Sequence, residues 1–168
     1  PVESMPFSIN RGQTNVVPLT LTFSNPGEEG TSDARLLGLR IQLQDESGEG
    51  IVPTDLLTRI QVSEGVNSYL DKTDIEATGS EVDLTLGIPI VITNIEPVTV
   101  GLQLDISPDT TVPAFRIAIV AGTWLMADNV VGGAPVPVVL ENGSYPVLSS
   151  LGRIVDEASI IAVTAPPA

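Results

Sequence analysis

The acidic side chains are the residues of this sequence best suited to chemistry. A glycine-containing loop and the segment just after it carry four of them: Asp45, Glu46, Glu49 and Asp55. Carboxylate oxygens are the hard ligands that Ca²⁺ prefers, and one loop can place several of them around an ion. The spacing is not that of an EF-hand, and acidic turn residues commonly do no more than solvate a loop. These four residues are the candidate metal site, and Ca²⁺ is the one cofactor they suggest.

Other carboxylates offer alternative calcium sites, namely Asp71 with Asp74, or Asp105 with Asp109 and Asp128. Two carboxylates can also hydrolyse a glycosidic bond when burial raises the pKa of one of them. No pair stands out here, and exposed acids on strands lack that burial. The sequence therefore predicts no catalytic residue, and it predicts that the chain is not an enzyme.

The composition excludes several classes of function. Histidine and cysteine are both absent, which removes Ser-His-Asp chemistry, thiol catalysis and cysteine-based zinc sites. Asp and Glu number 21 against 7 Lys and Arg, so the net charge is −14. Such a surface repels the phosphates of nucleic acids and of anionic lipids. No apolar run approaches the roughly 20 residues that span a bilayer. We therefore expect neither a nucleic-acid partner nor membrane insertion.

Aromatic residues are the usual platforms of sugar sites, and they make up only 4% of this chain. Phe23 and Phe115 are in phase with apolar strand faces, which leaves few residues to form a platform. Trp124 follows a small-residue approach and precedes a leucine, so we predict that it packs in the core. A glycan ligand remains an alternative.

Alternating apolar residues predict the elements that position these side chains. The clearest stretch is residues 98–120, which reads as two strands joined by the polar turn 107–111. We predict that it forms a hairpin near the centre of a sheet. A second hairpin is predicted over residues 135–148, because Asn142-Gly143 suits a type I′ turn. A last strand is predicted at residues 159–164.

These strands are short, and turn signals separate them at roughly 8–12 residues, which is typical of an all-β sandwich. No segment keeps a helical period, so helices of at most one turn are expected. We predict a single domain over residues 1–168 with about eight to ten strands.

Residues 9–27 carry a resemblance. Gly12-Gln13 leads into an alternating strand that ends in Asn25 and Gly27. This run resembles the opening of CARDB-like and related immunoglobulin-like modules of bacterial and archaeal surface proteins. The resemblance implies an immunoglobulin-like antiparallel sandwich, used in series as a spacer, an adhesive stalk or an addition to a secreted enzyme.

The function expected from these observations is a non-catalytic structural, spacer or adhesion module of an exported or cell-surface prokaryotic protein. Its location would be extracellular or at the cell surface, and its partners would be neighbouring domains or like subunits. One alternative is an extracellular filament or array subunit joined by β-strand addition, because residues 159–164 are apolar on both faces. Another is a carbohydrate- or calcium-dependent binding module.

Overall fold

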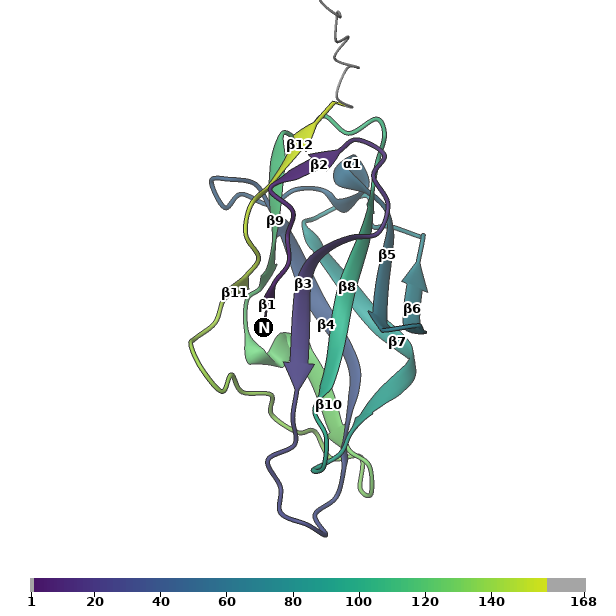
Figure 1. The fold of residues 1–168 in the computed structure, drawn as a ribbon, viewed down its shortest axis with the longest axis vertical. Helices are drawn as coiled ribbons and strands as arrows, with labels where there is room; N and C mark the ends of the chain where they lie inside the picture. The colour runs from purple at the N-terminus through teal and green to yellow at the C-terminus, as the bar shows by residue number, and fades with distance from the viewer. Residues whose placement is uncertain (1, 157–168) are drawn as a thin grey trace, which may run out of the picture.

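Two β-sheets packed face to face form the protein in a computed structural model that describes residues 2–156 (Figure 1). The first sheet contains, in spatial order, β1 (Val2–Glu3), β3 (Val16–Phe23), β8 (Val98–Ile106), β5 (Leu57–Glu64) and β6 (Asn67–Lys72). The second contains, in order, β10 (Leu125–Asn129), β4 (Ala34–Gln44), β9 (Ala114–Ile119), β12 (Gly152–Val155) and β2 (Ser8–Asn10), with β7 (Glu81–Ile92) on β4 and β11 (Val147–Leu148) on β9. The prediction of an all-β sandwich is confirmed.

Two details of the predicted sandwich differ from the structure. The described residues form twelve strands, several of only two to four residues, where about eight to ten were expected. In addition, β12 runs parallel to β2, so the second sheet is mixed and not purely antiparallel. The short helices fit the prediction: α1 (Pro53–Leu56) and the 3₁₀ turn η1 (Gly122–Trp124) are each about one turn long.

The core lies between the sheets and follows from the period of two. Along β8, Val100, Leu102, Leu104 and Ile106 are buried while the residues between them are only partly covered. Along β4, Leu36, Leu39, Ile41 and Leu43 point inward, with a register shift near Gly38 that restores the alternation. The outward side chains of β4 are then Arg35, Leu37, Arg40 and Gln42.

The predicted hairpin over residues 98–120 is wrong, although both of its strands exist. β8 belongs to the first sheet and β9 to the second, so residues 107–113 cross from one layer to the other. Contacts with the α1 turn hold this crossing, since Ser107 N donates to Leu56 O at 2.8 Å and the buried Thr110 hydroxyl donates to Asp55 O at 2.6 Å. Alternation reveals which face of a strand is buried, but not which strand lies beside it.

The predicted hairpin over residues 135–148 is also wrong. Val147 and Leu148 pair with Ile119 and Ala118 of β9, and residues 134–136 lie against β10 instead. Gly143 does have the positive φ, 92°, that its turn was expected to need. The two arms therefore lie against different strands, one against β9 and the other against β10. The strand predicted at residues 159–164 lies outside the described residues.

β9 and β10 follow each other along one edge of β4, opposite β7. β9 pairs with the Gln42–Gln44 end and β10 with the Ala34–Leu39 end, and η1 lies between them. The succession of β9, η1 and β10 along this edge positions the site described below. None of the helices within residues 2–156 has the length and apolar character needed to traverse a bilayer.

Candidate functional site

The predicted calcium ligands lie after β4 and in α1, and the carboxylates of two of the four, Asp45 and Glu46, already have partners. Asp45 Oδ1 accepts hydrogen bonds from Ser47 N at 2.8 Å, Ser47 Oγ at 2.7 Å and Glu49 N at 2.9 Å. The Ser47 hydroxyl, with help from these amides, lowers the pKa of Asp45 below its usual value. Glu46 forms an ion pair with Arg153 at 3.1 Å. Asp45 therefore organises the turn through its own side chain.

Asp55 stands apart in α1, where it is exposed. Within residues 2–156, no three or more acidic, histidine or cysteine side chains gather where they could hold a metal ion. The structure thus does not bring Asp45, Glu46, Glu49 and Asp55 together as one ligand set. Calcium binding by this loop stays a prediction.

Three of the five other candidate carboxylates face arginines, and the remaining two, Asp74 and Asp109, are exposed. Asp71 forms a two-bond ion pair with Arg59, and Asp105 lies 3.7 Å from the same guanidinium. Asp128 forms a two-bond pair with Arg35. These acids form ion pairs that link neighbouring strands.

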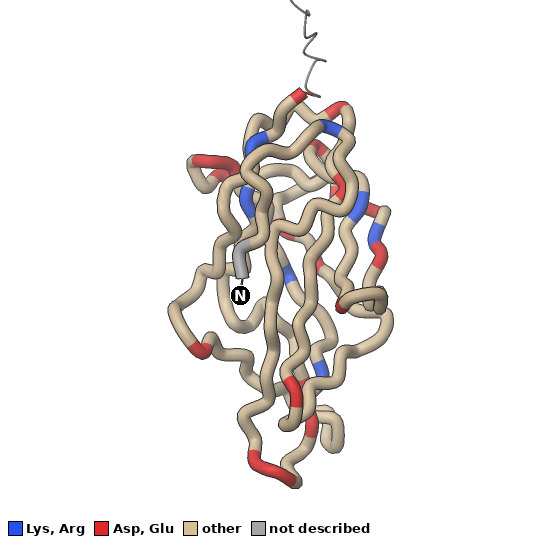
Figure 2. The backbone as a smooth tube through the Cα atoms, in the orientation of Figure 1, with Lys and Arg blue, Asp and Glu red and all other residues tan. Residues whose placement is uncertain are grey.

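Many of the remaining acidic residues lie in loops at the ends of the sandwich. One example is the β3–β4 loop, which contains Glu28 and Glu29 and lies at the foot of Figure 2.

Five of the six aromatic side chains are buried or partly buried, and a glycan ligand stays a prediction. Trp124 is partly buried and packs against the core, and the Arg40 guanidinium lies 5.8 Å from its ring centre. The Tyr69 hydroxyl donates to the Glu64 carboxylate at 2.8 Å, and this bond raises the pKa of Tyr69. Phe7 is exposed, far along the chain from both. The core role predicted for Trp124 is therefore only partly realised.

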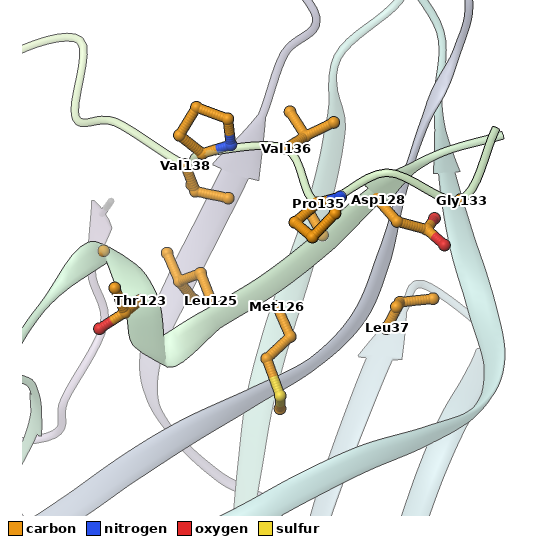
Figure 3. A pocket seen from close by; sticks show the side chains of 12 residues that line it. Leu37, Thr123, Leu125, Met126, Asp128, Gly133, Pro135, Val136 and Val138 are labelled. Carbon is orange, nitrogen blue, oxygen red and sulfur yellow. The ribbon is translucent and has the colours of Figure 1, made fainter. Parts of the chain in front are cut away.

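A groove beside β10 is a concave site with a mainly apolar lining. We call it the β10 groove, and it has a volume of about 740 Å³ (Figure 3). Apolar residues and glycines line most of it: Leu37, Gly122, Thr123, Leu125, Met126, Ala127, Asp128, Gly133, Pro135, Val136, Pro137 and Val138. One charged side chain and one hydroxyl are the exceptions. The groove therefore offers an apolar surface with few polar groups.

One wall of the groove is the segment 134–138, which folds back along β10. Val136 N donates to Ala127 O and Asn129 N donates to Ala134 O, both at 2.9 Å. Because Val136 directs its backbone toward β10, its neighbours Pro135 and Pro137 turn theirs outward, where their missing N–H groups leave no donor unsatisfied. The prolines therefore form an outer edge with few donors for pairing with another strand.

The turn that reverses the chain is built by Asn129 and two glycines. The Asn129 side chain accepts from Val131 N at 2.9 Å and Gly132 N at 3.3 Å, and its carbonyl accepts from Gly133 N. Gly133 has φ of 65°, which favours glycine. The turn holds segment 134–138 over β10.

The far end of the wall depends on a close approach. A Cβ atom on Gly122 would lie 2.6 Å from Val138 O and 3.2 Å from the Tyr145 ring. Only glycine lets the segment lie this near to η1. Tyr145 is itself partly buried there, which raises its pKa.

Asp128 is the one charged residue of the groove, and Arg35 fixes it in place. Arg35 Nε donates to Oδ1 at 2.9 Å, and Nη2 donates to Oδ2 at 2.7 Å. These hydrogen bonds lower the pKa of Asp128, although burial opposes them, so the carboxylate is ionised near neutral pH. The Asp128 side chain is 12% exposed and Arg35 is 33% exposed.

The sequence indicates Asp128 as a possible calcium ligand but does not predict the groove. Gly132-Gly133 between two apolar runs was a usable turn signal, since glycine pairs suit tight hairpins. The Pro-Val-Pro-Val run at residues 135–138 was instead assigned to the wrong hairpin. Leu37 and Met126 carried no signal, because an outward apolar residue on a strand is common.

Comparison with known proteins gives one distant likeness. No family model matches the chain, and no curated protein matches it. A solved structure described as AvmM, which catalyzes macrocyclization in alchivemycin A biosynthesis, is similar over 95% of this chain and 89% of its own length, at 16% identity and a TM-score of 0.44.

This finding corrects two predictions from the sequence. From a strand pattern without a catalytic motif, the sequence predicts a non-catalytic structural, spacer or adhesion module, and hence no enzyme. The similar structure is that of an enzyme, so both predictions are wrong as inferences from a β-sandwich pattern. At this level of likeness the neighbour's reaction does not pass to this chain.

Proposed function

We propose that this protein binds a small, largely apolar molecule in the β10 groove. The observation that carries the proposal is the groove itself, a 740 Å³ concavity that is lined mainly by aliphatic side chains and prolines. Its volume falls within the roughly 300–1,000 Å³ of typical small-molecule sites, and such sites combine an apolar lining with a few polar groups.

The exposure of apolar residues in and beside the groove supports this proposal. Met126, which lines the groove, is 40% exposed, and Val131 and Val139, which lie within two residues of the lining residues Gly133 and Val138 in the sequence, are 82% and 79% exposed. Clustered apolar surface that faces water is costly to leave uncovered and commonly marks a binding site. Methionine also adapts its shape, so Met126 can fit ligands of different outline.

The walls are suited to admitting a ligand. Segment 134–138 is joined to β10 through Val136 and Ala134, whereas its prolines add no donors. Such a lightly bonded wall can shift without breaking a full ladder of hydrogen bonds. Arg35 meanwhile holds Asp128 rigidly at one end of the groove.

The test is a titration with Nile red, a neutral dye whose fluorescence rises in apolar surroundings. The wild-type protein should bind one dye per chain. Met126→Glu should weaken binding by at least about tenfold, because a charge buried beside the dye lacks a partner.

Val66→Glu is the matched control. It adds the same charge at a fully exposed valine in the β5–β6 turn, distant in sequence from β10, and should leave dye binding unchanged. Equal weakening by the two variants, or no dye binding by the wild type, would overturn the proposal. So would concentration-dependent dimerisation that Met126→Glu abolishes, since a second copy would then be the natural occupant.

Two finer predictions from the sequence are also kept as proposals. Face-to-face packing of two sheets supports an immunoglobulin-like sandwich, although the parallel β2–β12 pair departs from it. An extracellular or cell-surface location is supported by the lack of cysteine and by the strongly acidic composition alone.

A further inference from the structure

The polar groups of the β10 groove lie at its two ends. Figure 3 shows the Asp128 carboxylate at one end and Thr123 at the other, with Leu125 and Met126 between them. An elongated ligand would therefore rest its apolar body on the middle and present a polar group to an end.

Asp128 keeps acceptor capacity after it pairs with Arg35. Each oxygen accepts one hydrogen bond from the guanidinium, and a carboxylate oxygen has lone pairs for two. A ligand hydroxyl or amine could use the remaining sites, and hydrogen bonds to an ionised oxygen are about twice as strong as neutral ones.

An anionic group finds no comparable partner. The lining residues include no lysine or arginine, and the positive charge of Arg35 is already balanced by Asp128. The whole chain carries a net charge of −14, which repels anions further. Charge thus favours an amphiphile with a hydroxyl or amine end over one with an anionic end.

We propose that the β10 groove takes an apolar molecule with a hydroxyl or amine at one end, bound by Asp128, and discriminates against a carboxylate on the same skeleton. This inference rests on the proposed binding function and adds the chemical class of the ligand. Asp128 acts here as the residue that determines specificity.

The experiment displaces Nile red with three compounds of eight carbons each: 1-octanol, octylamine and sodium octanoate, at neutral pH. Octanoate has seven apolar carbons against eight in the other two, which is worth only about fourfold in affinity, so a tenfold difference reports the polar end. We expect octanol and octylamine to compete at least about tenfold more strongly than octanoate. Equal competition, or stronger competition by octanoate, would overturn the inference.

A pair of variants tests whether Asp128 causes the discrimination. Asp128→Asn should bring the ratio of octylamine to octanoate affinity close to one or reverse it, because Arg35 is then free to meet the carboxylate. Asp71→Asn is the matched control, since Asp71 forms the same two-bond pair with Arg59 in the other sheet. It should keep the wild-type ratio, and thermal melting confirms that both variants fold.

The two proposals can fail separately. A wild-type protein that binds Nile red but treats the three compounds alike loses only the inference about the ligand. A protein that binds neither Nile red nor any of the octyl compounds, as measured by titration calorimetry, loses the binding function as well.

Discussion

Two arginine–aspartate pairs of the same geometry lie in different surroundings on the two sheets. Arg59 of β5 meets Asp71 of β6 through bonds of 2.7 and 2.6 Å, and Arg35 of β4 meets Asp128 of β10 through bonds of 2.9 and 2.7 Å. Asp71 is 46% exposed among polar neighbours, whereas Asp128 is 12% exposed at the end of an apolar groove.

The two ion pairs differ in what lies on the other edge of the strand that carries one of their residues, β5 for the first pair and β10 for the second. β5 has a full partner on each side, β6 and β8, so its ion pair only braces neighbouring strands. β10 has β4 on one side and the lightly bonded segment 134–138 on the other. The Arg59–Asp71 pair thus only links neighbouring strands, whereas the Arg35–Asp128 pair is also part of a candidate binding site.

The largest expected effect is on the free energy of unfolding, which should fall more for a leucine of the core than for a leucine of the groove. Leu104→Ala in β8 should lower the free energy of unfolding by about 2–5 kcal/mol, because a fully buried leucine leaves a cavity. Leu37→Ala should cost clearly less, because Leu37 is partly exposed on the outer face of β4, but it should weaken Nile red binding. Denaturant unfolding and dye titration measure both effects. Similar losses of stability would mean that the groove is packed as tightly as the core.

A smaller effect is expected where segment 134–138 approaches η1. Gly122→Ala should reduce stability by about 1–3 kcal/mol and disturb dye binding, since its Cβ would meet Val138 O. Gly132→Ala is the control, because its Cβ meets nothing within 4 Å and its φ is not positive. If the two variants melted and bound dye alike, the wall would not depend on the close approach at Gly122.

The smallest expected effect is on the free energy of unfolding at acid pH. Arg59 and Arg35 lower the pKa of Asp71 and of Asp128 below the ordinary 3.8, chiefly through hydrogen bonds. A group with a lowered folded-state pKa stabilises the fold above its unfolded pKa, and that stabilisation is lost as the pH falls through the folded value. Unfolding free energy should therefore decline below about pH 5 in the wild type, and less steeply in Asp71→Asn and Asp128→Asn.

The two aspartates should differ in the size of this acid effect. Asp128 is the less exposed, so water screens its pair less and its variant should flatten the pH curve more. Unfolding in denaturant at a series of pH values provides the measurement. Curves that run parallel to the wild type would show that neither pair matters to acid stability.

Much of the fold was predictable from the sequence, strand by strand. The positions of β3, β4, β8 and β9 follow from alternation, and from Val100 to Ile106 every second residue of β8 is buried. The candidate site was hardly predictable. Asp128 was named only as a possible calcium ligand, and Leu37 and Met126 drew no attention, because their role depends on a segment that folds back from elsewhere.

The period of two in the side chains determined by itself that this chain forms strands with one buried face, because each strand must hide its apolar row from water. Only the tertiary structure decided which strands became neighbours. Residues 98–120 were divided between two sheets and residues 135–148 between two strands, since pairing depends on which edges are free after the layers pack. That same choice left β10 with one lightly covered edge, and the groove exists there.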